Sequence, residues 1–134
     1  MIEYKELTSA SLEAIKALYR QHGWLAYLQD DAKLARAFDQ SLCAVGAYEG
    51  DELVGFIRCV GDGEHIVLAQ DLIVAQEHLR KGIGRELMRL AGERFADVRM
   101  FMLVTDALDE RANLFYQSIG MIKLEQNGCI TYMR

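Results

Sequence analysis

The sequence predicts an α/β protein: a mixed, mostly antiparallel sheet with helices on both faces, folded as one domain over residues 1–134. Two observations support this fold class. Short apolar segments are joined by turn-forming tetrads and glycine turns, at residues 49–52 and 61–63, which is typical of antiparallel hairpins. A strand ending at Val74 is followed by a glycine loop, an amphipathic helix and another apolar strand, and such a crossover joins parallel strands.

Each element follows from its hydrophobic period and its flanking residues. Alternating apolar and polar side chains predict half-buried strands, and apolar residues at three- and four-residue spacing predict helices. Thr8 or Ser9 caps the first helix, and His22-Gly23 ends it. The expected strands span residues 2–7, 42–48, 53–60, 65–74, 98–105, 121–125 and 129–133. The expected helices span residues 8–21, 30–40, 84–96 and 109–118.

Composition and charge limit the classes of partner. The formal net charge of -5 argues against nucleic-acid binding, because phosphate backbones need a basic surface. No apolar run approaches the roughly 20 residues of a membrane span, and the first residues do not resemble a signal peptide. Cys43, Cys59 and Cys129 lie far apart in apolar runs, which predicts buried, reduced thiols. We therefore expect a cytoplasmic protein with no metal, membrane or nucleic-acid partner.

The strongest functional signal is the loop after Val74. Seven residues lead to Gly82-Ile83-Gly84, which opens a helix. Glycines between a strand and a helix let consecutive N–H groups turn toward one point, and the helix N-terminus adds partial positive charge, so the loop suits a phosphate or pyrophosphate. Positive side chains gather in the same stretch, namely Arg80, Lys81, Arg85 and Arg89. This basic cluster is either part of an anion site or a solvated helix face.

Two common phosphate loops do not fit this stretch. A Walker A loop needs Lys-[Ser/Thr] after its second glycine, and a Rossmann loop needs a third glycine where Leu87 stands. Residues 79–84 instead resemble the pyrophosphate loop of the GNAT superfamily of N-acetyltransferases, [Q/R]-x-x-G-x-[G/A], with Leu79 in place of the usual first residue. Residues 71–74 resemble the end of that family's fourth strand, and residues 111–121 resemble its A-x-x-[F/L]-Y-x-x-x-G-F segment.

The resemblance implies the GNAT acyl-CoA N-acyltransferase fold, in which the fourth and fifth strands splay apart to hold acetyl-CoA. The acetyl group would pass directly to a primary amine, without a covalent enzyme intermediate. A backbone N–H near Leu72 would polarise the thioester carbonyl. The residues implied to hold acetyl-CoA are Leu72, Ile73 and Val74 for pantetheine, Arg80, Lys81, Gly82, Ile83, Gly84 and Arg85 for the pyrophosphate, and Asn113. Asp109 stands where an asparagine often contacts pantetheine.

The resemblance also implies a general acid. Tyr116 occupies the place where many family members hold a tyrosine that protonates the leaving thiolate, although it could instead be a packed aromatic. The base is open, because the usual positions on the fourth strand fall on Leu68 and Gln70, which cannot take a proton. Asp71 follows Gln70 directly, so strand alternation predicts that it points to the opposite face and is structural. A water chain remains an alternative base, as do Asp62, Glu64 and His65.

The acceptor is predicted to contact Trp24 and Tyr27, between the first two helices, and the turn that contains Asp62 and His65. Acidic residues in these segments, including Asp30, Asp31 and Glu64, favour a small cationic amine. A protein or peptide amine is the alternative acceptor, and a non-catalytic CoA-binding module is the alternative function. A member that acetylates charged tRNA is disfavoured by the acidic charge. The family's final strand pair often forms dimer contacts, so the resemblance also allows a homodimer.

Overall fold

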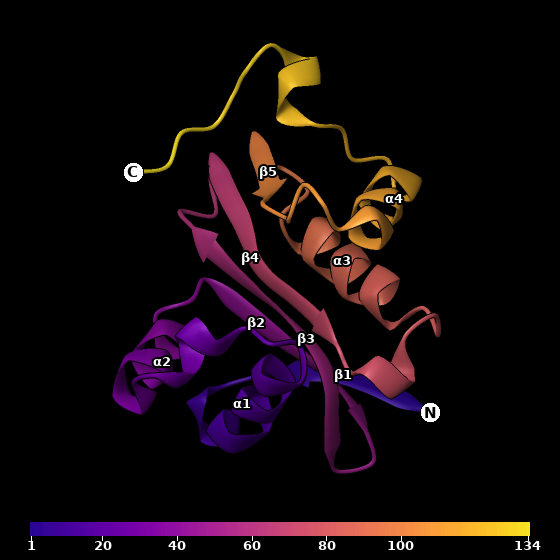
Figure 1. Ribbon diagram of the computed structural model, residues 1–134. Helices are drawn as coiled ribbons and strands as arrows, with labels where there is room; N and C mark the ends of the chain where they lie inside the picture. Colours follow the sequence, from indigo (N-terminus) through magenta and orange to yellow (C-terminus); the bar gives the residue numbers. More distant parts are fainter. The chain divides into compact units, whose positions relative to one another are not determined.

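The computed structural model describes residues 1–134 and divides into two units, Met1–Leu103 and Val104–Arg134. The first unit holds the whole sheet (Figure 1). Its strands are β1 (Ile2–Glu6), β2 (Cys43–Glu49), β3 (Glu52–Gly61), β4 (Ile66–Val74) and β5 (Met100–Leu103). Its helices are α1 (Leu12–Gln21), α2 (Asp31–Asp39) and α3 (Ile83–Arg94), with short 3-10 helices η1 (Ser9–Ser11), η2 (Leu25–Leu28) and η3 (Gln76–His78). The second unit holds α4 (Glu110–Ser118) and η4 (Leu124–Asn127).

The five strands form one sheet in chain order, β1-β2-β3-β4-β5. The first three pairings are antiparallel, and β4 and β5 are parallel because α3 crosses over between them. Helices α1 and α2 cover one face of the sheet and α3 covers the other (Figure 1). The predicted mixed, mostly antiparallel sheet with helices on both faces is confirmed.

The core lies on both faces of the central strand β3. Residues 53–59 of β3 are all buried, because helices cover this strand on each side, and it therefore lacks the polar alternation of a half-exposed strand. On one face Phe56 packs edge-on against Tyr19 of α1 and Phe38 of α2, with ring centroids 5.5 Å and 5.6 Å apart. On the other face Ile83 and Leu87 of α3 are fully buried.

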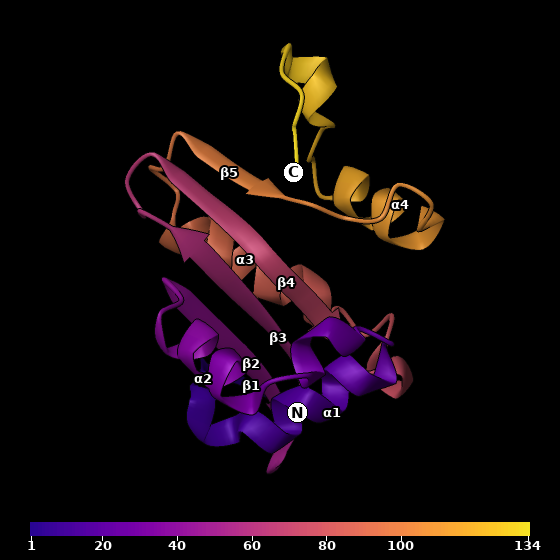
Figure 2. The same ribbon diagram turned by 60° about the vertical axis from the view of Figure 1, so that its left-hand side comes forward.

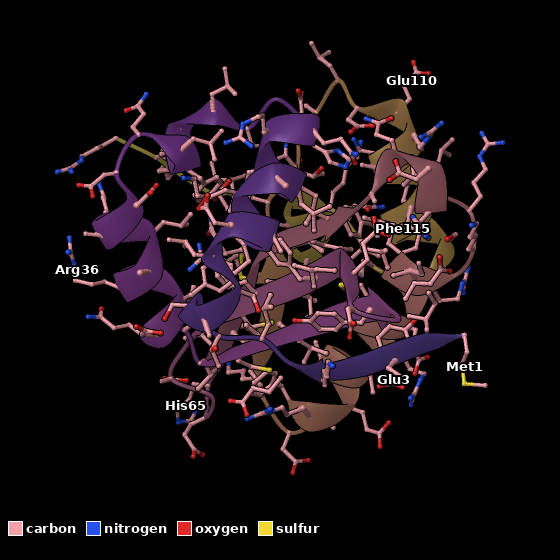
Figure 3. All side chains as sticks on the ribbon, turned by 90° about the horizontal axis from the view of Figure 1, so that it is seen from below. Met1, Glu3, Arg36, His65, Glu110 and Phe115 are labelled. Atoms are coloured by element: carbon pink, nitrogen blue, oxygen red, sulfur yellow. The ribbon has the colours of Figure 1, made fainter.

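The helix starts are capped as the sequence suggests. Thr8 accepts a hydrogen bond from the Ala10 N–H and opens η1, so α1 proper begins only at Leu12. Asp30 caps α2 by accepting from the Lys33 N–H at 3.0 Å. Figure 3 shows the polar side chains around the periphery, including the exposed Arg36 on α2.

The predicted strand pair at residues 121–125 and 129–133 is wrong. Residues 124–127 form the 3-10 helix η4, in which the Gln126 side chain accepts from the Lys123 N–H, and no residue after Leu103 belongs to a sheet. A two-stranded hairpin has little stability without a third strand or a packed face. Most side chains of residues 121–133 are exposed, so this stretch has no such face within its own unit.

The bounds of β5 and the burial of one cysteine differ from what the sequence predicts. Strand β5 begins later than predicted, because a turn follows α3 in which the Val98 N–H donates to the Phe95 carbonyl, and the strand already ends at Leu103. Cys43 and Cys59 are buried as expected, whereas Cys129 is exposed. No helix has the length and apolar character needed to cross a membrane.

Candidate functional site

Strand β4 has an open edge over its second half. Strand β5 pairs only with its first residues, from Ile66 with Met100 to Ala69 with Leu103. Leu103 is the last residue of β5, so no strand of the sheet pairs with β4 on this side beyond Ala69 (Figure 2). Residues 70–74 therefore have no strand partner on this side, where the resemblance predicts that the fourth and fifth strands separate.

A β-bulge lies at the point where the edge opens. Arg58 of β3 pairs with Asp71, and the next residue, Cys59, pairs with Ala69, so Gln70 is the extra residue. The prediction that Gln70 and Asp71 point to opposite faces is wrong, since both side chains hydrogen-bond the Tyr27 hydroxyl. Strict alternation fails here because a bulge shifts the side-chain period by one residue.

Backbone alternation decides which β4 groups face the opening. The Ala75 N–H donates to the Val54 carbonyl of β3 at 2.8 Å. Since N–H and C=O groups alternate in direction along a strand, Ile73 also faces β3, and Leu72 and Val74 face the open edge. The Val74 carbonyl already accepts from His22 Nε2 at 2.7 Å. Of the three predicted pantetheine contacts, Leu72 and the Val74 N–H are the groups available on this edge.

The loop after β4 forms a cradle of N–H donors. Arg80 and Gly82 both have left-handed backbone, with φ of 65° and 82°, a conformation that anion-binding nests use to turn successive N–H groups to one side. The N–H groups of residues 80–85 have no acceptor within the protein, and the first helical bond runs from Glu86 to the Gly82 carbonyl. The buried side chain of Ile83 anchors this exposed loop to the core. The predicted donors for a pyrophosphate are thus brought together.

The basic cluster is smaller than the sequence suggested. Arg89 is held by Glu86 and Glu93, at 2.8 Å and 2.6 Å, so it belongs to the solvated face of α3. Its partners stand at three- and four-residue spacing, a signal that the sequence analysis missed. Arg80, Lys81 and Arg85 form no ion pair and are exposed at the loop.

The end of α1 fixes the start of this loop. Besides the contact of His22 with Val74, the Gln21 side chain accepts from the Gln76 N–H at 2.8 Å. Sequence reasoning did not select Gln21 or His22, because neither belongs to a motif and their partners lie more than 50 residues away. Both contacts join the helix to the segment where the open edge meets the cradle.

A buried carboxylate lies beneath the bulge. Asp71 accepts from Arg58 Nε, the Tyr19 hydroxyl and the Tyr27 hydroxyl, each at 2.8 Å. Arg58 and Asp71 are both buried, so this ion pair is shielded from solvent. Burial raises the pKa of the Tyr19 phenol, and the nearby Asp71 carboxylate raises it further. Burial is also the main cause that raises the pKa of the Tyr27 phenol. Both hydroxyls therefore keep their protons and act as donors. Asp71 is the structural residue that we predicted.

The turn before β4 is remote from the opening. His65 is exposed near the start of β4 (Figure 3), and five residues along a strand separate it from Gln70 by roughly 15 Å. Asp62 accepts from the N–H groups of Glu64, His65 and Ile66, and these backbone bonds lower the pKa of its carboxyl to about 2. Asp62 therefore shapes the turn and holds no proton near neutral pH, and we do not retain it or His65 as acceptor residues.

Replacing Asp62 with alanine is expected to lower the melting temperature at pH 7. Because its folded-state pKa lies below the ordinary value of 3.8, its stabilising effect is present above about pH 4 and is lost as the pH falls toward 2. The difference in melting temperature between wild type and Asp62→Ala should therefore shrink between pH 5 and about pH 3. A difference that stays constant over this range would contradict the assigned role.

Two of the other acidic residues proposed for a cationic acceptor have partners within the protein. Asp31 pairs with Lys16 Nζ at 3.0 Å, and Asp30 caps α2. Glu64 is exposed and lies on the remote turn. Trp24 and Tyr27 are nearer to the opening, and Tyr27 stacks on Tyr19 with ring centroids 4.2 Å apart. The acidic residues therefore give little support to a cationic substrate. Of the side chains proposed to contact the acceptor, Tyr27 is the one that lies beside Gln70 at the opening.

The remaining predicted residues belong to the second unit. Tyr116 lies on α4, where burial and the Asp109 carboxylate raise the pKa of its phenol to about 12. Asn113 donates both amide hydrogens, to the Asp106 and Asp109 carbonyls, which commits its donors to the start of α4. Asp109 accepts from the Ala112 N–H and caps that helix. The contact predicted between Asn113 and the cofactor could use only its amide oxygen.

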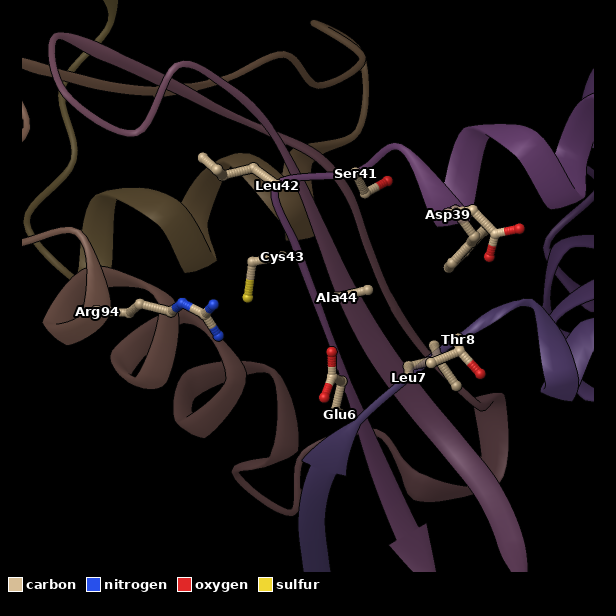
Figure 4. A pocket seen from close by; sticks show the side chains of 10 residues that line it. Glu6, Leu7, Thr8, Asp39, Ser41, Leu42, Cys43, Ala44 and Arg94 are labelled. Carbon is tan, nitrogen blue, oxygen red and sulfur yellow. The ribbon is translucent and has the colours of Figure 1, made fainter.

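A polar pocket lies elsewhere in the first unit, where the end of β1 and the start of β2 meet the last turn of α3 (Figure 4). Its charged side chains include Glu6, Asp39 and Arg94. The sheet order places it on the β1–β2 side, away from the β4 edge. No group of three or more side chains suited to a metal ion is present.

The comparisons with known proteins agree with this geometry. The sequence model of the acetyltransferase (GNAT) family matches residues 8–121. The chain belongs to this family. It is 34% identical to a GNAT-family acetyltransferase from Streptococcus pneumoniae TIGR4, with a TM-score of 0.84 over 100% of this chain and 96% of that one.

Two other relatives are informative. This GNAT acetyltransferase is 28% identical over 129 residues to an uncharacterized N-acetyltransferase ycf52-like protein of Prochlorococcus marinus, covering 93% of this chain and 69% of that protein. PaiA N-acetyltransferase from Thermoplasma acidophilum, solved in complex with coenzyme A, is 18% identical, with a TM-score of 0.78 over 90% of this chain and 89% of that one. The second match shows a shared fold.

Proposed function

We propose that this GNAT acetyltransferase transfers an acetyl group from acetyl-CoA to a primary amine. One observation carries the proposal: the open half of β4 is followed, after the short η3, by a loop whose N–H groups, from Arg80 to Arg85, have no acceptor in the protein. A strand edge suits the amides of a pantetheine arm, and the cradle with its three unpaired cations suits a pyrophosphate. Joined end to end, they fit a ligand that carries both groups.

The chain supplies donors for each stage of this reaction. Acetyl-CoA brings a thioester carbonyl that an amine nitrogen can attack. The Leu72 N–H, on the open edge beyond the bulge, would donate to the carbonyl oxygen as negative charge develops there. Tyr116 would give its proton to the departing thiolate as the carbon–sulfur bond breaks, and the proton released from nitrogen would pass to solvent. The family motif and the raised pKa of Tyr116, which keeps the proton in place, support this role.

Turnover with a panel of amines tests the proposal. Purified protein is mixed with acetyl-CoA and an alkylamine, an arylalkylamine, a polyamine or a peptide amine, and release of the CoA thiol is recorded. The proposed function predicts amine-dependent thiol release with at least one class, and the class used separates a small-molecule from a peptide acceptor. Acetyl-CoA binding without turnover on any amine would indicate a non-catalytic CoA-binding module.

The Tyr116→Phe variant is expected to lower kcat about 100-fold, because general acids typically contribute at least that much. Its dissociation constant for CoA should stay within about twofold, since the phenol acts on the leaving thiolate only during turnover. With a pKa of about 12, Tyr116 keeps its proton across the working range, so it should cause no alkaline loss of wild-type activity below about pH 10. An unchanged kcat in Tyr116→Phe would rule out the acid role and leave Tyr116 as a packed aromatic.

A further inference from the structure

The hydroxyl of Tyr27 occupies an unusual position on η2, beside the bulge in β4. It donates to Asp71 Oδ1 at 2.8 Å and lies 3.3 Å from Gln70 Nε2, which donates to it. The bulge is what allows two consecutive strand residues to reach the same oxygen. The Tyr27 hydroxyl has no part in the proposed steps of acetyl transfer at Leu72 and Tyr116.

The hydrogen bonds that the Tyr27 hydroxyl already makes limit what kind of further partner its oxygen can bind. A tyrosine hydroxyl has one hydrogen to donate and two lone pairs to accept with. The Asp71 carboxylate takes the hydrogen, and the Gln70 amide takes one lone pair. One lone pair remains, so any further partner of the Tyr27 hydroxyl must be a hydrogen-bond donor.

The surrounding residues hold this acceptor in a fixed orientation. The Tyr27 ring stacks on Tyr19 with an angle of 15° between the rings, and Arg58 and Tyr19 fix the Asp71 carboxylate from its other sides. Asp71 is only 2% exposed, whereas Tyr27 is half-buried, so a ligand can reach the tyrosine without reaching the carboxylate. The negative charge of Asp71 draws the hydroxyl proton toward itself and strengthens the Tyr27 oxygen as an acceptor.

The Tyr27 hydroxyl oxygen lies at the start of the open edge of β4. It contacts Gln70, which is the first β4 residue beyond the last pairing with β5 and lies two residues before Leu72. The proposed function places the thioester carbonyl at Leu72, so a nucleophile attacking that carbonyl from the side of α1 and η2 would pass Tyr27. The sequence predicts Tyr27 as an acceptor contact, and the structure adds the two hydrogen bonds that its hydroxyl makes.

We propose that the Tyr27 hydroxyl oxygen accepts a hydrogen bond from the attacking nitrogen of the acceptor amine, and that Asp71 is the positioning residue that fixes this oxygen as an acceptor. This inference rests on the proposed function. As nitrogen shares its lone pair with the carbonyl carbon it becomes positively charged, and its N–H groups become stronger donors. The bond to Tyr27 is therefore stronger in the transition state than in the bound substrate, which is the condition for a contribution to rate.

The test compares two tyrosine variants that each remove one hydroxyl from the same carboxylate. Tyr27→Phe keeps the stacked ring and should lower kcat/KM for the amine about 10- to 100-fold, the cost of one hydrogen bond to a charged group. The KM for acetyl-CoA should stay within about twofold, because the cradle is untouched. Tyr19→Phe, whose hydroxyl also donates to Asp71 but is fully buried, should lower the melting temperature and reduce kcat/KM for the amine less than Tyr27→Phe does, because the Tyr27 hydroxyl is still present in that variant.

Equal losses of kcat/KM in the two variants, or none in Tyr27→Phe, would overturn the inference, since either result makes Tyr27 a structural residue only. A second measurement does not depend on either variant folding. In wild-type protein saturated with CoA, added amine should shift the Tyr27 Cζ resonance and leave that of Tyr19 in place, and an unmoved Tyr27 signal would contradict direct contact. Amine-dependent turnover by the wild type separates the two claims: if it occurs and Tyr27→Phe is unaffected, only this inference fails, and if it is absent, both fail.

Discussion

Replacing Asp71 with alanine is expected to lower the free energy of unfolding by about 3–5 kcal/mol, because it leaves the buried Arg58 guanidinium without its counter-ion. The same change removes the acceptor of the Tyr19 and Tyr27 hydroxyls, and the Tyr19 hydroxyl would then be buried without a partner. Urea denaturation at pH 7, followed by circular dichroism, measures the loss.

Arg89→Ala provides the matched control. It breaks two ion pairs as short as that of Asp71, but Arg89 is 55% exposed and its pairs are screened by water. The expected loss is below about 1 kcal/mol. Similar losses in Asp71→Ala and Arg89→Ala would show that the network beneath the bulge has no special weight in the stability of the fold.

The second large effect is expected in the cradle. Replacing Arg80, Lys81 and Arg85 together with alanine should raise the dissociation constant for CoA at least about 100-fold, since each loses a charge-assisted contact to the pyrophosphate. The affinity of the wild type should also fall as salt is raised from about 50 mM to 500 mM, and that of the triple variant should fall much less. Isothermal titration calorimetry at both salt concentrations measures the two effects.

Arg89→Ala is again the control, because its guanidinium is held by Glu86 and Glu93 rather than free to reach a ligand. Its dissociation constant for CoA should match that of the wild type within about twofold. If Arg89→Ala weakens CoA binding as much as the triple variant does, the separation of the basic cluster into ligand-facing and solvated residues is wrong.

Much of the fold could be predicted because its signals are local. The buried face of α1, the β2–β3 hairpin and the glycine loop each follow from spacing within one segment. The cradle was predictable for the same reason: left-handed backbone at Gly82 and the free N–H groups of a helix start depend on adjacent residues.

The parts that were missed depend on contacts between distant segments. Nothing in the local sequence marks Gln70 as a bulged residue, and the bulge alone brings Gln70 and Asp71 to one hydroxyl. The final strand pair was predicted from its alternating pattern, but a pattern does not form strands unless a neighbouring strand or packed face is present. Arg89 is a different case, because its partners at three- and four-residue spacing were visible in the sequence.

The central claim is that the open edge of β4 and the cradle after it together bind CoA. Backbone amide NMR of the labelled protein during a CoA titration tests it most directly, because each N–H reports its own environment. We expect the largest shifts at residues 80–85 and at Leu72 and Val74, with little change around Glu6 and Arg94 in the pocket on the β1–β2 side. The absence of any shift, or shifts centred on that pocket with the cradle unaffected, would contradict the claim.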